Sequence, residues 1–240
     1  MAALQTAKKD LRRKVRDVLL TLPKESIASQ STIVTNQLLS LPEYRNAKRI
    51  GVYLSMPSGE ISTTSIVQNA LKSGKEVFIP YIHTTENAPA QPKSSVMDML
   101  ALNSMEEFES LKPDKWGIPS LDEASISDRE NCLGGYGVAS PWHPHTARKS
   151  PGLDLIVMPG MAFDKSLRRL GHGKGYYDRF LARYSTDEER KKSTPQRPFL
   201  VALALKEQVL QPPEEIPVSE HDWPVDAVIV GDGQIISPRS

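Results

Sequence analysis

The chain has 240 residues, of which 39% are hydrophobic and 25% charged, and its formal net charge is +1 at pH 7. This length allows one large domain or two small ones with a sizeable core. The near-neutral charge argues against a dedicated nucleic-acid-binding protein, which carries a strong basic excess. The single cysteine, Cys132, excludes a disulfide within the chain and is typical of a reducing compartment such as the cytoplasm.

The N-terminal segment raises the question of targeting. No run is apolar enough to span a membrane, and no signal peptide opens the chain. Six basic residues between Lys8 and Arg16 would fit a mitochondrial transit peptide, but Asp10 and Asp17 break its acid-poor pattern. Apolar residues at helical spacing favour an ordinary amphipathic helix over residues 6–22. We expect a cytoplasmic protein, with a mitochondrial location as the alternative.

Helices and strands alternate along most of the remaining chain. Further helices are expected from near Ser26 to Ser40, over residues 63–73 before Gly74, and from near Gly175. Short apolar runs predict six strands: Arg49–Met56, Glu76–Ile82, Ser95–Leu102, Leu153–Gly160, Phe199–Leu205 and Val225–Asp232. This alternation predicts a Rossmann-like, three-layer α/β/α fold with a largely parallel central sheet of about six strands.

One segment departs from this alternation. Residues 120–151 are rich in Gly, Ser and Pro and lack periodicity, so we expect one domain over residues 1–240 with a loop insertion at 120–151. His143 and His145 within it could be metal ligands. Because no cysteine or acid stands nearby at ligand spacing, they more plausibly face solvent.

Three alternating glycines, Gly171, Gly173 and Gly175, follow the Leu153–Gly160 strand and lie between Arg169 and Lys174. Glycines at this density let the backbone approach a ligand closely, and flanking cations favour a phosphate. The alternative is a tight turn with solvated cations. The spacing matches neither a Walker A loop nor a dinucleotide fingerprint. Ligands of parallel α/β sheets bind at the carboxyl ends of the strands, where this cluster follows.

The segment MPGMAFDKSLRRLGHGKGYYDRFL (Met158–Leu181) closely resembles the signature of the 5-formyltetrahydrofolate cyclo-ligases, also called 5,10-methenyltetrahydrofolate synthetases. Departures from that signature are His172 and Leu167. Further blocks resemble the family in the same order: KKDLR (Lys8–Arg12), LSMPSGEIST (Leu54–Thr63), KWGIP (Lys115–Pro119) and IPVSEHDWPVD (Ile216–Asp226).

The resemblance implies an ATP- and Mg²⁺-dependent closure of 5-formyltetrahydrofolate to 5,10-methenyltetrahydrofolate, with release of ADP and phosphate. It implies Lys174 and Arg169 as the catalytic cations and Asp178 and Asp222 as the metal ligands. It implies ATP binding by Lys8, Lys9, Asp10, Leu11, Arg12, Arg169, Leu170, Gly171, His172, Gly173, Lys174, Gly175, Tyr176 and Tyr177. It implies folate binding by Leu54, Glu60, His172, Gly173, Lys174, Gly175 and Tyr176.

Each of these residues also has an ordinary structural interpretation. Lys8 and Arg12 could be a solvated helix face, Glu60 could favour the N-terminus of the following helix, and Asp222 could form a turn. Tyr176, Tyr177 and Trp116 could be packing residues. Rival functions are a non-catalytic folate- or nucleotide-binding protein and a sugar-phosphate or coenzyme A transferase on a similar fold. We expect a monomer with small-molecule partners and neither nucleic acid nor membrane.

Overall fold

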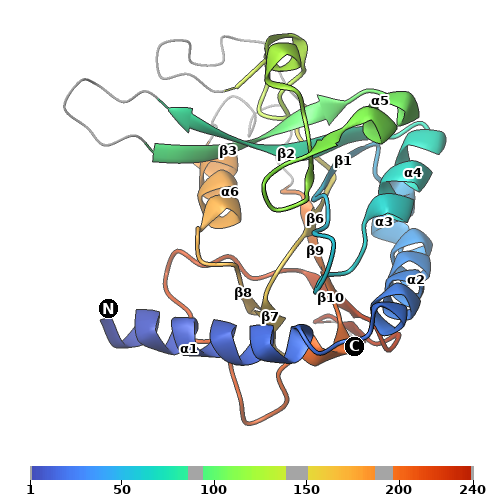
Figure 1. Ribbon diagram of the computed structural model, residues 1–240. Helices are drawn as coiled ribbons and strands as arrows, with labels where there is room; N and C mark the ends of the chain where they lie inside the picture. Colours follow the sequence, from blue (N-terminus) through green and yellow to red (C-terminus); the bar gives the residue numbers. More distant parts are fainter. Residues whose placement is uncertain (1, 86–93, 139–150, 187–196, 239–240) are drawn as a thin grey trace.

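The computed structural model describes residues 2–85, 94–138, 151–186 and 197–238 (Figure 1). One seven-stranded sheet has the order β11-β10-β9-β6-β1-β2-β3. The five strands from β10 to β2 are parallel, and β3 and β11 are antiparallel at the two edges. The strands are β1 (Arg49–Val52), β2 (Glu76–Thr85), β3 (Ser94–Leu102), β6 (Leu155–Met158), β9 (Phe199–Ala204), β10 (Ala227–Val230) and β11 (Ile235–Ile236).

Helices cover both faces of this sheet. The helices α2 (Lys24–Ser40), α3 (Pro42–Asn46) and α4 (Thr64–Lys72) lie on one face, and α6 (Tyr176–Thr186) lies on the other (Figure 1). The remaining elements are α1 (Ala2–Leu19), α5 (Met105–Ser110), β4 (Lys112–Pro113), β5 (Pro119–Ser120), β7 (Ala162–Phe163), β8 (Arg169–Leu170) and the 3₁₀ helices η1 (Glu123–Asp128) and η2 (Lys206–Gln208). The predicted three-layer α/β/α class with a largely parallel sheet is confirmed.

The central strands are apolar along their whole length because both faces are covered. In β6, Leu155 and Val157 belong to the hydrophobic cluster beneath α2 and α4, whereas Ile156 and Met158 belong to the cluster beneath α6. This alternation follows from the two-residue period of a strand. Because the residues on both faces of β6 are buried, the strand is recognisable in the sequence as a continuous apolar run.

Several element boundaries differ from those predicted. The first helix begins at Ala2 and ends at Leu19, rather than spanning residues 6–22, and the first strand ends at Val52, rather than at Met56. After α2 the short helix α3, which was not predicted, begins at Pro42, a residue suited to a first helical turn because its missing N–H would be unpaired there anyway. The prediction of Gly74 after α4 is confirmed by its positive φ of 74°.

Part of the segment predicted as a loop insertion packs against the sheet. Arg129 pairs with Glu107 and donates to the Ala101 carbonyl, and the buried Asn131 side chain donates to the Gly137 carbonyl. Residues 120–138, which include η1, are therefore integral to this edge of the fold. His143 and His145 lie outside the described residues. Whether residues 120–151 are an insertion into a single domain stays a prediction.

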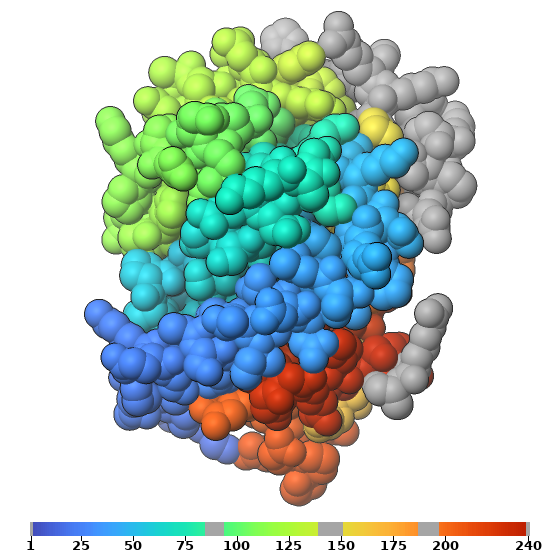
Figure 2. Space-filling model, turned by 90° about the vertical axis from the view of Figure 1, so that its right-hand side faces the viewer, coloured from blue at the N-terminus to red at the C-terminus, as the bar shows by residue number. Residues whose placement is uncertain are grey.

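The strand order creates a place for a ligand. Among the parallel strands, β1 and β6 are neighbours, yet the chain leaves β1 toward α4 on one face and leaves β6 toward α6 on the other. Such a reversal opens a crevice at the carboxyl ends of the two strands. The helix α1 crosses this end of the sheet (Figure 1), and in the side view it borders α2 and the C-terminal segment (Figure 2).

Candidate active site

The glycine loop lies beyond the carboxyl end of β6, between β8 and α6. The ribbon of β7 and β8 leads into it, and Gly173 and Gly175 adopt positive φ angles of 99° and 64°. Side chains are strained in this region of backbone conformation, so glycine is required for the shape of the loop. From α1, the Arg12 Nε–H donates to the Gly171 carbonyl over 2.8 Å. The first helix therefore holds the loop from the opposite side.

Arg169 and Asp178 form the first of two ion pairs in this crevice. Arg169 Nη2 lies 2.9 Å from Asp178 Oδ1, and the arginine side chain is 3% exposed. The same carboxylate oxygen accepts a hydrogen bond from the Trp223 backbone N–H at 3.2 Å. Asp178 thus connects β8, α6 and the C-terminal block.

Lys8 and Asp222 form the second ion pair. Lys8 Nζ lies 2.5 Å from Asp222 Oδ2, which also accepts from the Ser219 N–H and hydroxyl. Burial alone would raise the pKa of Asp222, but these hydrogen bonds and the lysine charge outweigh it and lower that pKa. Each predicted metal ligand therefore lies beside a cation that was itself predicted to bind phosphate.

Two further groups bear on the charge of the loop, His172 as a neutral side chain among cations and Lys174 as a cation. Desolvation lowers the pKa of His172, and the charges of Arg169, Arg12 and Arg16 lower it further. Lys174 is exposed and makes no hydrogen bond or ion pair within the described part of the chain. An exposed cation on a glycine-rich backbone is well placed to meet an incoming anion.

Glu60 lies in a separate, buried part of the crevice. Its carboxylate accepts a hydrogen bond from the Met56 N–H at 2.9 Å, and the residue is 6% exposed. Burial raises the pKa of Glu60 to about 7, although the hydrogen bond from Met56 works in the opposite direction. A carboxyl group inside a crevice with its pKa shifted toward 7 is a feature of functional sites.

Unpaired buried atoms give the strongest structural indication of a ligand. In the described ranges, two buried side-chain polar atoms lack a hydrogen-bond partner, and they are Arg169 Nε and the Tyr177 hydroxyl. Native proteins satisfy nearly all such groups, and each exception requires an explanation. Both atoms belong to this crevice, so an acceptor supplied by a ligand would satisfy them.

The structure brings together most of the predicted site residues but not all of them. The residues grouped around the crevice are Lys8, Arg12, Arg169, Glu60, Asp178, Asp222 and the loop from Gly171 to Tyr177. Lys9 is exposed, and Asp10 pairs with Arg13 on the surface of α1. Leu11, Leu54 and Leu170 pack against the hydrophobic core. Tyr176 lies beneath the Arg179 guanidinium.

Sequence reasoning missed the roles of Tyr53 and Ser219. The Tyr53 hydroxyl donates to the Ile61 carbonyl at 3.1 Å and thereby shapes the segment that carries Glu60. Ser219 holds Asp222, as described above. Ser219 lies in the same block, Ile216–Asp226, as Asp222. Its closeness to Asp222 in the sequence could have identified it as a partner of that carboxylate.

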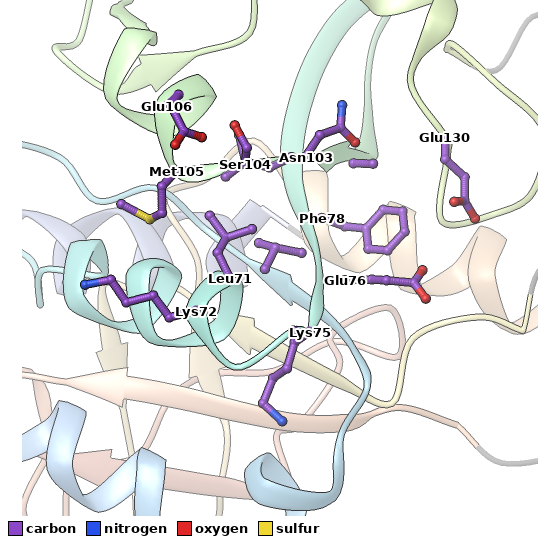
Figure 3. Close-up of a pocket in the computed structure, with 14 residues that line it drawn as sticks. Leu71, Lys72, Lys75, Glu76, Phe78, Asn103, Ser104, Met105, Glu106 and Glu130 are labelled. Carbon is purple, nitrogen blue, oxygen red and sulfur yellow. The ribbon is translucent and has the colours of Figure 1, made fainter.

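A cavity of about 570 Å³ lies elsewhere, between α4, β2, β3 and α5 (Figure 3). It sits at the amino end of β2. Three of its charged groups already have partners: Lys75 donates to the Ala47 carbonyl, and Glu76 and Glu130 both pair with Arg49. We therefore place the candidate site in the crevice at the carboxyl end and not in this cavity.

Comparison with known proteins identifies the family of the chain. The 5-formyltetrahydrofolate cyclo-ligase family model matches residues 4–231. The chain belongs to this family. It is 37% identical to the 5-formyltetrahydrofolate cyclo-ligase of Mus musculus, covering 97% of this chain and 98% of the mouse protein. It is 34% identical to the Saccharomyces cerevisiae cyclo-ligase, with coverages of 94% and 95%.

Solved structures of the family share the fold. The 5,10-methenyltetrahydrofolate synthetase of Aquifex aeolicus superimposes with a TM-score of 0.63 at 26% identity, covering 97% of this chain and 93% of that one. The synthetase of Mycoplasma pneumoniae, at 15% identity and a TM-score of 0.55, supports the fold alone. All the relatives named here are cyclo-ligases or synthetases, which gives no support to the rival functions. No helix in the described ranges is long and apolar enough to cross a membrane.

Proposed function

We propose that this crevice catalyses the ATP- and Mg²⁺-dependent closure of 5-formyltetrahydrofolate to 5,10-methenyltetrahydrofolate, with release of ADP and phosphate. The observation that carries the proposal is the glycine loop, which groups Arg12, Arg169 and Lys174 at the carboxyl end of β6 in a chain of the cyclo-ligase family. Membership of the family supports ATP as the co-substrate.

The chemistry requires activation of a poor electrophile. The formyl oxygen on N5 attacks the γ-phosphorus of ATP, the bond from that phosphorus to the bridging oxygen breaks, and ADP leaves. The substrate's N10 then attacks the activated carbon and loses its proton, and the C–O bond breaks to release phosphate. Because the substrate supplies both nucleophiles, the protein positions the reactants and stabilises charge on the transferred phosphoryl group. We assign that stabilisation to Arg169 and Lys174, assisted by Lys8 and Arg12.

Asp178 and Asp222 fit a magnesium site that is completed by ATP. Mg²⁺ is commonly held by one or two carboxylates together with substrate phosphates. The described residues contain no cluster of three or more His, Cys, Asp or Glu side chains suited to a metal ion, so the phosphates of ATP would have to supply further ligands. When bound, Mg²⁺ would neutralise charge on the phosphates. Lys8 and Arg169 would then be free to turn from the carboxylates to the nucleotide.

The folate fits beside Glu60. The segment that carries Glu60 lies against a neighbouring loop, because a Cβ on Gly117 would lie 2.7 Å from Pro57 Cγ. The preceding residue, Trp116, is 57% exposed despite its large apolar ring. An exposed aromatic ring next to this segment is suited to contact a planar ligand. We infer that Glu60 accepts hydrogen bonds from the polar edge of the folate.

The direct test is a near-ultraviolet absorbance assay for the methenyl product. Purified protein is mixed with 5-formyltetrahydrofolate, ATP and Mg²⁺, and each component is left out in turn. We expect product only in the complete mixture, in an amount equal to the ADP formed. Folate binding without turnover would instead support a non-catalytic binding protein.

Asp178→Asn and Asp222→Asn are each expected to raise the Mg²⁺ concentration needed for half-maximal turnover, because a neutral amide binds the cation less well than a carboxylate. The measurement is a Mg²⁺ titration at fixed ATP. Asp128→Asn is the matched control, since Asp128 is exposed in η1. Unchanged titration curves in both site variants would remove these carboxylates from the metal site.

A cytoplasmic location and a monomeric state remain our predictions. The relative from Arabidopsis thaliana, 29% identical over 97% of this chain, is named as a mitochondrial cyclo-ligase. Fluorescence imaging of the tagged full chain and light scattering of the purified protein test these two predictions separately.

A further inference from the structure

The hydroxyl of Tyr177 differs from those of the buried tyrosines described in the chain. The hydroxyls of Tyr44 and Tyr53 donate to Asn69 Oδ1 and to the Ile61 carbonyl, and the Tyr184 hydroxyl accepts from the Leu153 N–H at 2.6 Å. The Tyr177 hydroxyl is equally buried but has no partner. Packing alone does not account for it, because a phenylalanine would fill the same space without leaving a polar atom unpaired.

The surroundings of this hydroxyl are polar and charged. Its ring packs where the two hydrophobic clusters meet at the end of the sheet, and the Arg169 guanidinium lies 5.9 Å from the ring centroid. Burial, together with the negative charge of Glu60, raises the pKa of Tyr177, while Arg169 lowers it only in part. A tyrosine hydroxyl can donate one hydrogen bond, and this one finds no acceptor among the described residues.

Glu60 and Tyr177 together form a complementary pair of hydrogen-bonding groups. When it is ionised, the Glu60 carboxylate accepts from N–H groups, whereas the Tyr177 hydroxyl is a donor without an acceptor. A cyclic amide carries the complementary groups side by side: its N–H can donate to Glu60, and its carbonyl oxygen can accept from Tyr177. The pterin ring of the folate has such an edge. ATP offers phosphate oxygens, which would not match a neighbouring carboxylate.

We propose that the Tyr177 hydroxyl donates a hydrogen bond to an oxygen of the reduced folate and determines specificity for the folate together with Glu60, in place of the ATP contact implied by the family resemblance. This assignment rests on the proposed function. It accounts for a buried hydroxyl that is satisfied only when the substrate is bound.

The test compares Tyr177→Phe with Tyr184→Phe, two deletions of one hydroxyl from the same helix. Calorimetry measures the Kd of 5-formyltetrahydrofolate and, separately, that of ATP, and thermal unfolding gives Tm. We expect Tyr177→Phe to weaken folate binding about tenfold, to leave ATP binding unchanged, and to keep or raise Tm. We expect Tyr184→Phe to lower Tm and to leave both Kd values unchanged, because its hydroxyl is bonded to Leu153.

The possible outcomes separate this inference from the function on which it rests. Unchanged folate affinity in Tyr177→Phe, or weaker binding of ATP alone, overturns the role proposed for Tyr177 and leaves the cyclo-ligase reaction standing. Failure of the wild-type protein to bind 5-formyltetrahydrofolate overturns the proposed function, and the role of Tyr177 with it. A lower Tm in Tyr177→Phe shows a structural hydroxyl and also contradicts the inference.

Discussion

Replacing Lys174 with methionine is expected to lower turnover by about 10²-fold or more, the scale for losing one group that stabilises charge in the transition state. The ammonium group lies on an exposed loop and has no partner within the described ranges, so it is available to the transferred phosphoryl group. Its removal takes little from the core, and thermal unfolding is expected to stay unchanged. Steady-state kinetics with saturating ATP and folate measure the effect.

Two variants make the test of Lys174 specific. Lys72→Met removes an exposed lysine from α4, away from the crevice, and should keep full turnover. Gly173→Val should act differently, because a side chain at a φ of 99° strains the loop and obstructs the ligand, so KM is expected to rise. Near-normal turnover in Lys174→Met would show that the glycine loop is a structural turn.

Replacing Glu60 with glutamine is expected to weaken binding of 5-formyltetrahydrofolate by about 10- to 100-fold, the range for losing a charge-assisted hydrogen bond. The same change is expected to stabilise the protein above pH 7 by up to about 3 kcal/mol, because it removes an ionised group that is unfavourable when buried. Calorimetric binding and chemical denaturation measure the two effects. Glu109→Gln on the exposed face of α5 is the control for both.

The pH dependence of this stabilisation has a definite sign. The pKa of Glu60 rises from an ordinary 4.5 to about 7 on folding, so the folded state binds more protons between these values. The stability of the wild-type protein therefore falls as pH rises from about 4.5 to 7, and the advantage of Glu60→Gln disappears near pH 4. Equal stabilities of the two proteins at pH 8 would contradict burial of an ionised Glu60.

The sequence predicts the fold well where burial imposes a pattern. The strand β6 was recognisable because both of its faces are covered, which leaves a continuous apolar run. The helix α5 was missed because none of its six residues is buried, so no apolar period marks it. The strand β11 is only two residues long. The start of α1 was placed too late because Ala2–Leu4 form helix by propensity without periodicity.

The site was predictable only where its residues are neighbours in the chain. The glycine loop was recognisable in the sequence and its place after β6 followed from the sheet, while its binding of phosphate stays a prediction. The pairing of Lys8 with Asp222 could not be predicted, because 214 positions separate the two residues and only the folded sheet brings them together. The burial of Glu60 could not be predicted either, because its position in the sequence was equally consistent with a role at the N-terminus of the following helix.

The way in which α1 is anchored has a consequence for its motions. Its buried residues are Lys8, Val15 and Leu19, so apolar packing holds only the second half of the helix. The first half is held by the polar contact of Lys8 with Asp222, and Arg12, just beyond the midpoint, bonds the glycine loop. Local opening is easiest where few apolar contacts are lost. Amide hydrogen exchange should therefore be fast over the first turns of α1 in the free protein and slow selectively when nucleotide engages these cations, which makes this helix a direct reporter of site occupancy.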